Sequence, residues 1–226
     1  MNLVIYSQKT FGEVFYEKKM LDIKNNRKKV SSKNSFFKFR EKINKNLKKV
    51  TYSLIFNETE SLFFSSKIME KDIDRSLKLA INFGGGRGIL YTNIKTKLKL
   101  HQADGYGERF LINGEIKYNW IITQETKKID KYLCYKAILK DNTSKKGKDI
   151  IAWFSPEIPF SFGPNGYCAL PGLILELELS NGFLFKAVKI NFKKNNLKKI
   201  IKPKKGVKIS EEEFLKIGKE TMRKRN

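Results

Sequence analysis

The sequence is poor in the side chains from which enzymes build nucleophilic and metal sites. It contains one histidine, His101, and two cysteines, Cys134 and Cys168. A single histidine excludes a histidine-rich metal centre, and any nucleophile–histidine arrangement would have to use His101. Two cysteines without a C-x-x-C motif supply neither four zinc ligands nor a redox pair. The sequence therefore predicts no metal site and no cofactor.

Long apolar runs are also missing. No stretch approaches the roughly 18 consecutive apolar residues of a membrane-spanning helix. The run Leu3–Ser7 is shorter than the roughly 7–15 apolar residues of a secretory signal, and no basic residue precedes it. It has the character of the last residues of such a signal, so residues 1–10 are interpreted as a signal remnant or a disordered start. From these residues we expect a protein exported through a signal not shown in this sequence, or a cytoplasmic one if Met1 is the true start.

Acidic residues are few: the chain has 23 Asp and Glu and 47 Lys and Arg, which gives a formal net charge of +24. Only seven of the basic residues are arginine, the side chain that base readout and bidentate phosphate contacts favour. The lysine-rich runs Lys18–Lys49 and Lys186–Lys208 therefore favour a solvated surface, and a nucleic-acid interface remains an alternative. The acid-free stretch Lys193–Lys208 is a candidate for peripheral contact with an anionic membrane or an acidic partner.

Short runs of alternating apolar residues follow one another along most of the chain and predict a mainly β (α+β) fold built as an antiparallel meander. Asn113-Gly114 and Asn181-Gly182 are the predicted hairpin turns. Residues 11–193 are expected to form one β-rich domain with helix or loop insertions at 24–49 and 66–86. Residues 194–226 are expected to be a basic extension, whose short helix begins at a capping box formed by Ser210 and Glu213.

One loop, "SPEIPFSFGPNGYCALPG", stands out between two predicted strands. Its prolines remove backbone donors, and its apolar side chains must pack on the sheet or on a ligand. The corner Leu170-Pro171-Gly172 suits a tight turn, because Pro171 fixes φ and Gly172 permits a positive φ. The candidate ligand contacts of this loop and its flanks are Trp153, Pro156, Ile158, Pro159, Phe160, Phe162, Gly163, Pro164, Tyr167, Leu170, Pro171 and Gly172.

The strand predicted after this loop, Leu173–Leu179, places leucines on one face and Glu176 and Glu178 on the other. Carboxylates two residues apart on a strand lie roughly 6.5 Å apart, a spacing at which paired carboxylates can flank a sugar bond. An amphipathic strand with a solvated acidic face is commoner. An envelope hydrolase using Glu176 or Glu178 is therefore kept as an alternative function.

The segment "WFSPEIPFSFGPNGYCALPGLILELEL" resembles the hallmark of the GLPGLI family of Bacteroidota proteins, with Ala169 in the place of the motif's first glycine. The upstream segment "GERFLINGEIKYNWIITQETKKIDKYLCYKAIL" and the N-terminal "FGEVFYEKK" resemble the same family. The resemblance implies export to the bacterial envelope, in some members near outer-membrane receptors, and it carries no known biochemical activity.

The strand order also loosely resembles the curved half-barrels of outer-membrane lipoprotein carriers, in which a bent sheet holds an apolar ligand. By that analogy the proline loop is expected to cover the concave face as a lid. We expect a non-enzymatic binding or chaperone-like module for an apolar ligand or for an outer-membrane or periplasmic partner protein. An exported setting also favours a disulfide between Cys134 and Cys168, which in a reducing compartment would remain two buried thiols.

Overall fold

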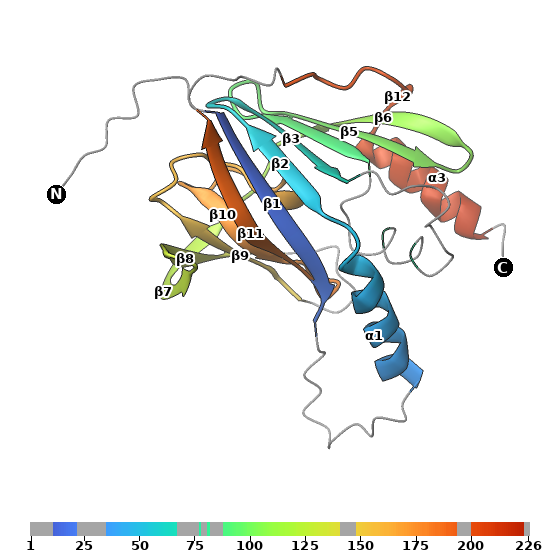
Figure 1. Ribbon diagram of the computed structural model, residues 1–226. Coiled ribbons are helices and arrows are strands. Elements are labelled where there is room, and N and C mark those ends of the chain that lie inside the picture. Colours follow the sequence, from blue (N-terminus) through green and yellow to red (C-terminus); the bar gives the residue numbers. More distant parts are fainter. Residues whose placement is uncertain are drawn as a thin grey trace.

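The computed structural model of the 226-residue chain describes residues 11–21, 35–66, 77, 81, 88–140, 148–193 and 200–223. The described residues form one 12-stranded sheet and two helices (Figure 1). The first half of the chain contributes β1 (Phe11–Met20), α1 (Ser35–Leu47), β2 (Tyr52–Phe56), β3 (Glu60–Ser65), β4 (Ile89–Asn93), β5 (Leu98–Gly105) and β6 (Glu108–Glu115). The second half contributes β7 (Ile121–Ile129), β8 (Tyr132–Leu139), β9 (Ile150–Ser155), the 3₁₀ turn η2 (Pro164–Gly166), β10 (Leu173–Glu178), β11 (Phe183–Lys193), β12 (Val207–Ser210) and α3 (Glu211–Arg223).

The sheet consists of two meanders joined through β1. The strand order is β12-β6-β5-β4-β3-β2-β1-β11-β10-β9-β8-β7, antiparallel throughout except for the parallel pair β12–β6. The predicted mainly β fold is therefore confirmed. The parallel pair makes the sheet mixed, because β12 arrives from the C-terminal side rather than through a hairpin.

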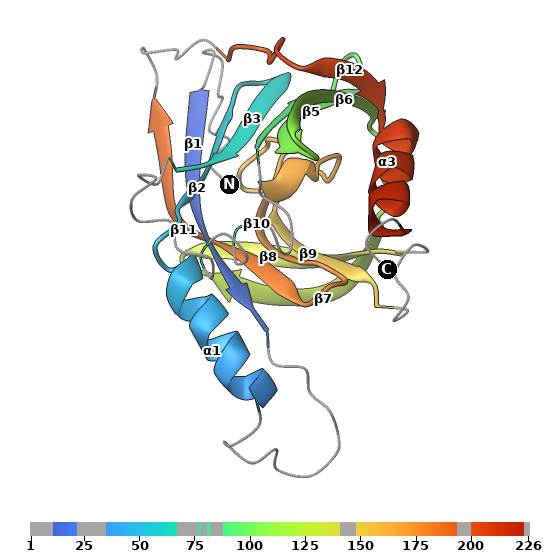
Figure 2. The same cartoon turned by 90° about the vertical axis from the view of Figure 1, so that its right-hand side faces the viewer.

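The connection between the two meanders requires the sheet to curve. Residues 116–120 alone lead from β6 to β7, which lie ten strand positions apart in the sheet. A flat sheet would separate these strands by about 48 Å, whereas five linking residues span at most about 20 Å. The sheet therefore bends until its two ends approach each other, and Figure 2 shows this curved wall from the side.

The main hydrophobic cluster lies inside the curve and includes residues from both meanders. Large aromatic side chains such as Tyr16, Phe56, Phe63 and Phe185 are completely or almost completely buried there. Alternation explains this distribution, because every second residue of β2 and β3 points to the concave side while the others face outward.

One of the two predicted hairpin turns is wrong. Gly182 adopts a φ of 86° in a turn between β10 and β11, as predicted for Asn181-Gly182. Asn113 and Gly114 instead lie within β6, and the strand continues through Glu115. A Cβ atom on Gly114 would come within 2.5 Å of the Glu211 carboxylate at the start of α3. The glycine therefore makes room for a helix about a hundred residues later in the chain.

Part of the segment expected as a basic extension packs on the sheet. β12 pairs with β6, and α3 packs Phe214 against Phe110 at a ring-centroid distance of 5.5 Å. The predicted capping box is present: the Ser210 backbone N–H donates to Glu213 Oε2 at 2.7 Å, and the Glu213 N–H donates to Ser210 Oγ at 3.1 Å.

One sequence-based expectation falls mainly on residues outside the described part. Of the helix or loop insertion expected at residues 66–86, only Ser66, Leu77 and Ile81 are described. Within the range 24–49, where a helix or loop insertion was expected, α1 spans Ser35–Leu47. Within the described residues no helix is long and apolar enough to cross a membrane.

Candidate functional site

The proline loop, residues 156–172 between β9 and β10, runs through the interior of the curved sheet. Backbone hydrogen bonds attach it to the start of β10: the Leu173 N–H donates to Ile158 O at 3.0 Å, and the Ile174 N–H donates to Phe162 O at 2.9 Å. Phe162 and Cys168 also form an isolated antiparallel bridge within the loop. These bonds satisfy polar backbone groups that the apolar interior would otherwise leave unpaired.

The apolar side chains of the loop fill the concave side of the sheet. Ile158, Phe160, Phe162 and Leu170 are all buried. The ring centroid of Phe56 lies 4.8 Å from that of Phe160 and 6.2 Å from that of Phe162. The loop therefore supplies part of the core where a lid over a ligand cavity was expected.

The other candidate loop residues divide by exposure. Gly163, Pro164 and Gly172 are buried, Trp153 and Tyr167 are half-buried, and Pro156, Pro159 and Pro171 are exposed. Gly163 approaches Ile174 so closely that a Cβ atom would lie 2.6 Å from its Cδ1. Gly172 has the expected positive φ, 152°, and a Cβ there would lie 2.3 Å from Ser155 O.

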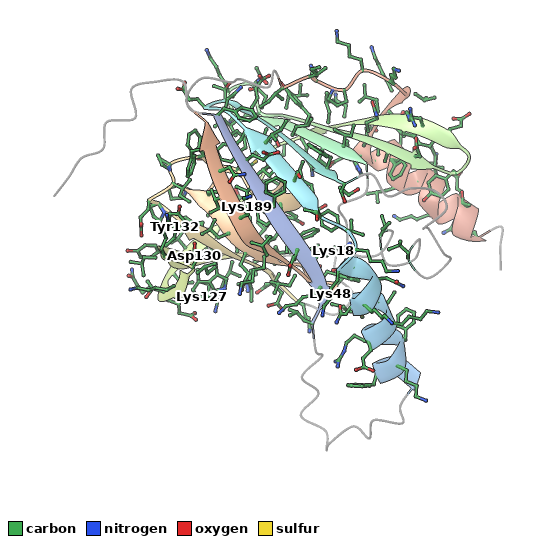
Figure 3. The ribbon with its side chains drawn as sticks, in the orientation of Figure 1. Lys18, Lys48, Lys127, Asp130, Tyr132 and Lys189 are labelled. Atoms are coloured by element: carbon green, nitrogen blue, oxygen red, sulfur yellow. The ribbon has the colours of Figure 1, made fainter. Side chains whose placement is uncertain are left out.

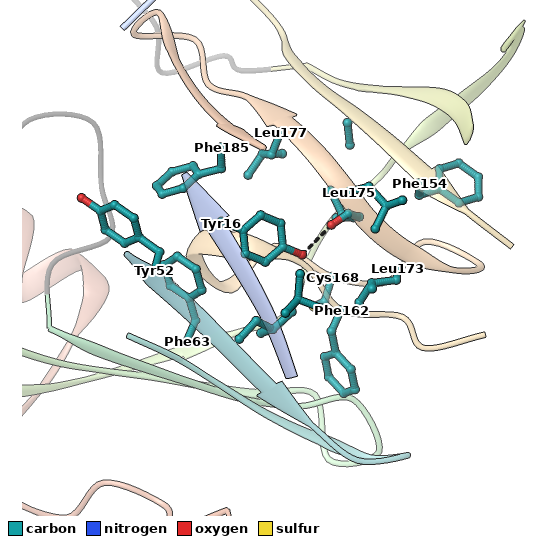
Figure 4. Close-up of a cluster of buried hydrophobic side chains, with 14 of the residues drawn as sticks. Tyr16, Tyr52, Phe63, Phe154, Phe162, Cys168, Leu173, Leu175, Leu177 and Phe185 are labelled. Atoms are coloured by element: carbon teal, nitrogen blue, oxygen red, sulfur yellow. Dashed lines mark hydrogen bonds between the residues drawn. The ribbon is translucent and has the colours of Figure 1, made fainter. Parts of the chain in front are cut away.

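Side chains from two distant segments form hydrogen bonds with the loop and with the start of β10. Tyr16 on β1 donates a hydrogen bond to Ile174 O at 2.6 Å inside the aromatic cluster (Figure 4). Tyr118, in the link from β6 to β7, stacks on Tyr167 at 5.2 Å and donates to Gly166 O at 3.2 Å. Trp120 Nε1 donates to Cys168 O at 2.9 Å. Sequence reasoning missed this role, although Tyr118 and Trp120 lie close together in the aromatic segment "KYNW".

Ala169 lies at a strained position in the family-like motif. Its φ is 69°, in the left-handed region that favours glycine. This conformation gives a physical reason why the motif has glycine at this place in the family that the sequence resembles.

The predicted disulfide is absent, since Cys134 and Cys168 are both free and buried. Cys134 on β8 pairs across the sheet with Lys127, whereas Cys168 lies in the interior loop beside Trp120. Burial raises the pKa of the Cys134 thiol to about 11 and that of Cys168 to about 12. Both side chains are therefore neutral core thiols near pH 7.

Glu176 and Glu178 lie on the outer face of β10. Lys127 forms an ion pair with Glu176, and its ammonium lies 4.3 Å from the centre of the Trp153 ring. Trp153 and Glu176 are also paired across β9 and β10. These contacts give Glu176 a structural partner across the sheet. Within the described residues no group of three His, Cys, Asp or Glu side chains is placed to hold a metal ion.

A groove of about 710 Å³ lies on the outer face of β5 and β6. Its floor is apolar, with Leu98 half-buried and Leu100 and Leu111 buried. The C-terminal strap, residues 200–206, and β12 form the opposite wall, as the red segment above β5 and β6 indicates (Figure 1). This volume is in the usual range of small-molecule sites, roughly 300–1,000 Å³.

The rim of the groove is basic. Lys202, Lys204 and Lys208 line it from the strap and β12 and are exposed. The one acidic residue of the lining, Glu213, accepts hydrogen bonds from Ser210 in the helix cap, and these bonds hold its pKa below the usual range. The groove therefore combines an apolar floor with positive charge. Sequence reasoning missed it because the strap was interpreted as part of an extension.

Comparison with known proteins supports the family resemblance over part of the chain. Residues 140–176 match the family described as "Protein of unknown function (Porph_ging)", the GLPGLI family. The matched region contains β9, the whole proline loop and most of β10. The sequence similarity thus falls on the segment that fills the core. No curated protein matches the chain.

The fold is similar to that of PNGF-II, solved in the space groups P21 and C2. Both structures align with a TM-score of 0.56 and 17% identity over 92% of this chain. The aligned region is 33% of the PNGF-II chain in the first structure and 32% in the second, so this chain corresponds to about a third of that protein. At this identity the similarity concerns the fold alone.

Proposed function

We propose that the protein is a non-enzymatic binding module of the bacterial cell envelope that holds an apolar ligand carrying an anionic group. The groove between β5, β6 and the C-terminal strap is the binding site. The observation that carries this proposal is the combination of the leucine floor with Lys202, Lys204 and Lys208 at the rim. The apolar part of the ligand packs on the leucines, and its anionic group pairs with the lysines.

The filled interior supports this placement. The sequence-based expectation placed an apolar ligand on the concave side of the sheet. The side chains of the proline loop already occupy that side, so we assign the ligand to the outer groove. Long-chain carboxylates have the required chemistry, since their tails are apolar and their head groups are charged at neutral pH. The envelope location rests on the GLPGLI-family resemblance and on the match of residues 140–176.

The test measures binding of dodecanoate by displacement of a fluorescent fatty-acid probe. Leu98→Trp fills the half-buried floor and is expected to weaken dodecanoate binding at least tenfold. Lys204→Glu is expected to weaken it several-fold because it reverses a charge at the rim. Lys205→Glu is the matched control: Lys205 is the next residue of the strap, is exposed and does not line the groove.

Dodecanol tests the role of the anionic group, because it keeps the alkyl chain and lacks the charge. The proposal requires dodecanoate to bind more tightly than dodecanol and Lys205→Glu to bind like the parent protein. Absence of saturable binding, or equal losses in Lys204→Glu and Lys205→Glu, would refute the site. Fractionation of source cells tests the location, and recovery in the cytoplasmic fraction would refute the envelope assignment.

A further inference from the structure

The helix α1 packs on the sheet through its C-terminal half. Ile43 and Leu47 are buried in the main hydrophobic cluster, with 2% and 1% of their surfaces exposed. The Asn44 side chain accepts a hydrogen bond from the Met20 N–H at 2.7 Å and donates one to Met20 O at 3.1 Å, so it satisfies both backbone groups of the last residue of β1. These contacts fix the end of α1 on the sheet and set the direction in which the rest of the helix points.

The N-terminal half of α1 projects beyond the sheet. It extends past the end of β1 in two perpendicular views (Figure 1, Figure 2), whereas Lys48, just after the other end of the helix, lies beside β1 (Figure 3). Phe39 lies one turn before Ile43 on the same face of the helix, because residues four apart face the same side. It is 43% exposed, whereas Ile43 is 2% exposed. The apolar stripe of α1 therefore continues beyond the part of the sheet that covers it.

The projecting residues 37–42, which we call the tip of α1, combine aromatic rings with positive charge. Lys38 and Lys42 are exposed on either side of the exposed ring in the sequence. The Arg40 guanidinium lies 5.0 Å from the centre of the Phe37 ring. The tip contains three basic residues and one acidic residue, and the seven residues that follow add three lysines and no acid. The helix thus carries an excess of positive charge around an exposed aromatic side chain.

We propose that the tip of α1 inserts Phe39 into the head-group region of a bilayer that contains anionic phospholipids, while the neighbouring cations pair with the lipid charges. Charge complementarity identifies the partner, since basic residues in a helix next to a membrane attract anionic lipids. An aromatic ring at the boundary between head groups and acyl chains, with cations at the head groups, is typical of peripheral membrane helices. The projecting shape also suits this partner, because fluid head groups rearrange around a convex surface.

This surface is separate from the outer groove, whose lining comes from β5, β6, the strap and the residues from β12 to the start of α3. The proposal therefore does not depend on the ligand of that groove. It also differs from the membrane contact that the sequence suggested for Lys193–Lys208, because it assigns the contact to α1.

The test is sedimentation of the full chain with vesicles made of equal parts phosphatidylcholine and phosphatidylglycerol, compared with vesicles of phosphatidylcholine alone. Binding to the anionic vesicles is expected, and its affinity should fall as salt is added, because salt screens the attraction between the charges. Vesicles of phosphatidylcholine should bind at least tenfold more weakly, because they lack the net charge that attracts the lysines.

The role of the ring is tested with the charge kept constant. Phe39→Ser should weaken binding to the anionic vesicles several-fold, because it removes apolar surface that enters the bilayer. Phe192→Ser is the matched control: Phe192 is 40% exposed and pairs with Gly12, at the other end of β1 from α1. Phe39→Trp should retain binding, and vesicles with brominated acyl chains should quench the fluorescence of this variant more strongly than that of the parent protein.

The role of the charge is tested with a pair of substitutions on each helix. Lys38→Gln combined with Lys42→Gln should weaken binding to the anionic vesicles at least tenfold, at about fivefold per lysine. Lys216→Gln combined with Lys219→Gln is the matched control, since both lysines are exposed on α3. The control pair removes the same net charge, so it should lose much less affinity if the tip is the site of contact.

The outcomes decide the proposal. Absence of binding to the anionic vesicles, or equal losses in Phe39→Ser and Phe192→Ser, would refute insertion of the tip. Equal losses in the two lysine pairs would show general attraction of a positive protein to anions and would overturn the assignment to α1. Binding of polyglutamate without binding of vesicles would identify an acidic protein as the partner and exclude the membrane.

Discussion

Replacement of Lys18 by methionine should remove a pH dependence of stability that the buried lysine imposes. Lys18 is 2% exposed, and three aromatic rings surround its ammonium. In the unfolded chain the side chain has an ordinary pKa near 10.5, whereas burial lowers the pKa of Lys18 to about 7 in the folded protein. Between these two values the unfolded chain binds more protons than the folded chain. The free energy of unfolding therefore rises with pH through this window and is lowest below pH 7.

The magnitude follows from the two pKa values. The full difference corresponds to about 5 kcal/mol of destabilisation when Lys18 is charged, at 1.36 kcal/mol per pKa unit. Between pH 6 and pH 9 the linkage raises the free energy of unfolding by about 2.7 kcal/mol. Lys18→Met lacks this contribution. The stability advantage of the variant over the parent should thus be largest at pH 6 and shrink by about 2.7 kcal/mol by pH 9.

Urea denaturation followed by tryptophan fluorescence at pH 6, 7, 8 and 9 measures both proteins. All other ionisable groups are common to both proteins, so their contributions cancel in the difference. The same low chloride concentration should be used at every pH, because screening by salt alters electrostatic contributions to stability. A difference that stays constant across this pH range within about 0.5 kcal/mol would refute the reasoning.

Three further substitutions test the proline loop and its contacts by urea denaturation, and the first two have a matched variant. Phe162→Ala should cost about 3–5 kcal/mol because the ring is fully buried, whereas the exposed Pro159→Ala should change stability little; a small loss for Phe162→Ala would indicate a lid. Tyr16→Phe should cost about 1–2 kcal/mol by leaving Ile174 O without its donor. Tyr52→Phe should not destabilise, since the Tyr52 hydroxyl is buried without a partner among the described residues. Ala169→Gly should stabilise by about 0.5–1 kcal/mol by relieving the positive φ, and a loss would contradict that strain.

Local patterns predicted most of the strands, because alternation and turn residues act over a few positions. "YSLIF" and "ESLFFS" are β2 and β3, and the Ser210–Glu213 cap begins α3 as expected. The predictions that failed concern residues whose structure depends on distant parts of the chain. Asn113-Gly114 has the sequence of a turn, but Gly114 is needed for its close approach to Glu211 of α3, which the local sequence does not show. The strand β12 was not predicted, because it lies in a lysine-rich run and forms only through its pairing with β6. No local sequence signal identifies a parallel partner so far away.

Lys18 and the outer groove show the same division between local and non-local information. Alternation along β1 places Lys18 in phase with Val14 and Tyr16, so the sequence alone marks it as a lysine at a core position. What the sequence cannot supply is the surrounding aromatic cluster, because Phe183 and Phe185 come from β11 at the other end of the domain. The outer groove likewise needs a strap that folds back on β5 and β6. Within the described residues, strand pairing therefore places lysines next to apolar side chains from distant parts of the chain: Lys18 lies among Phe183 and Phe185, and Lys202 and Lys204 line one groove with Leu98.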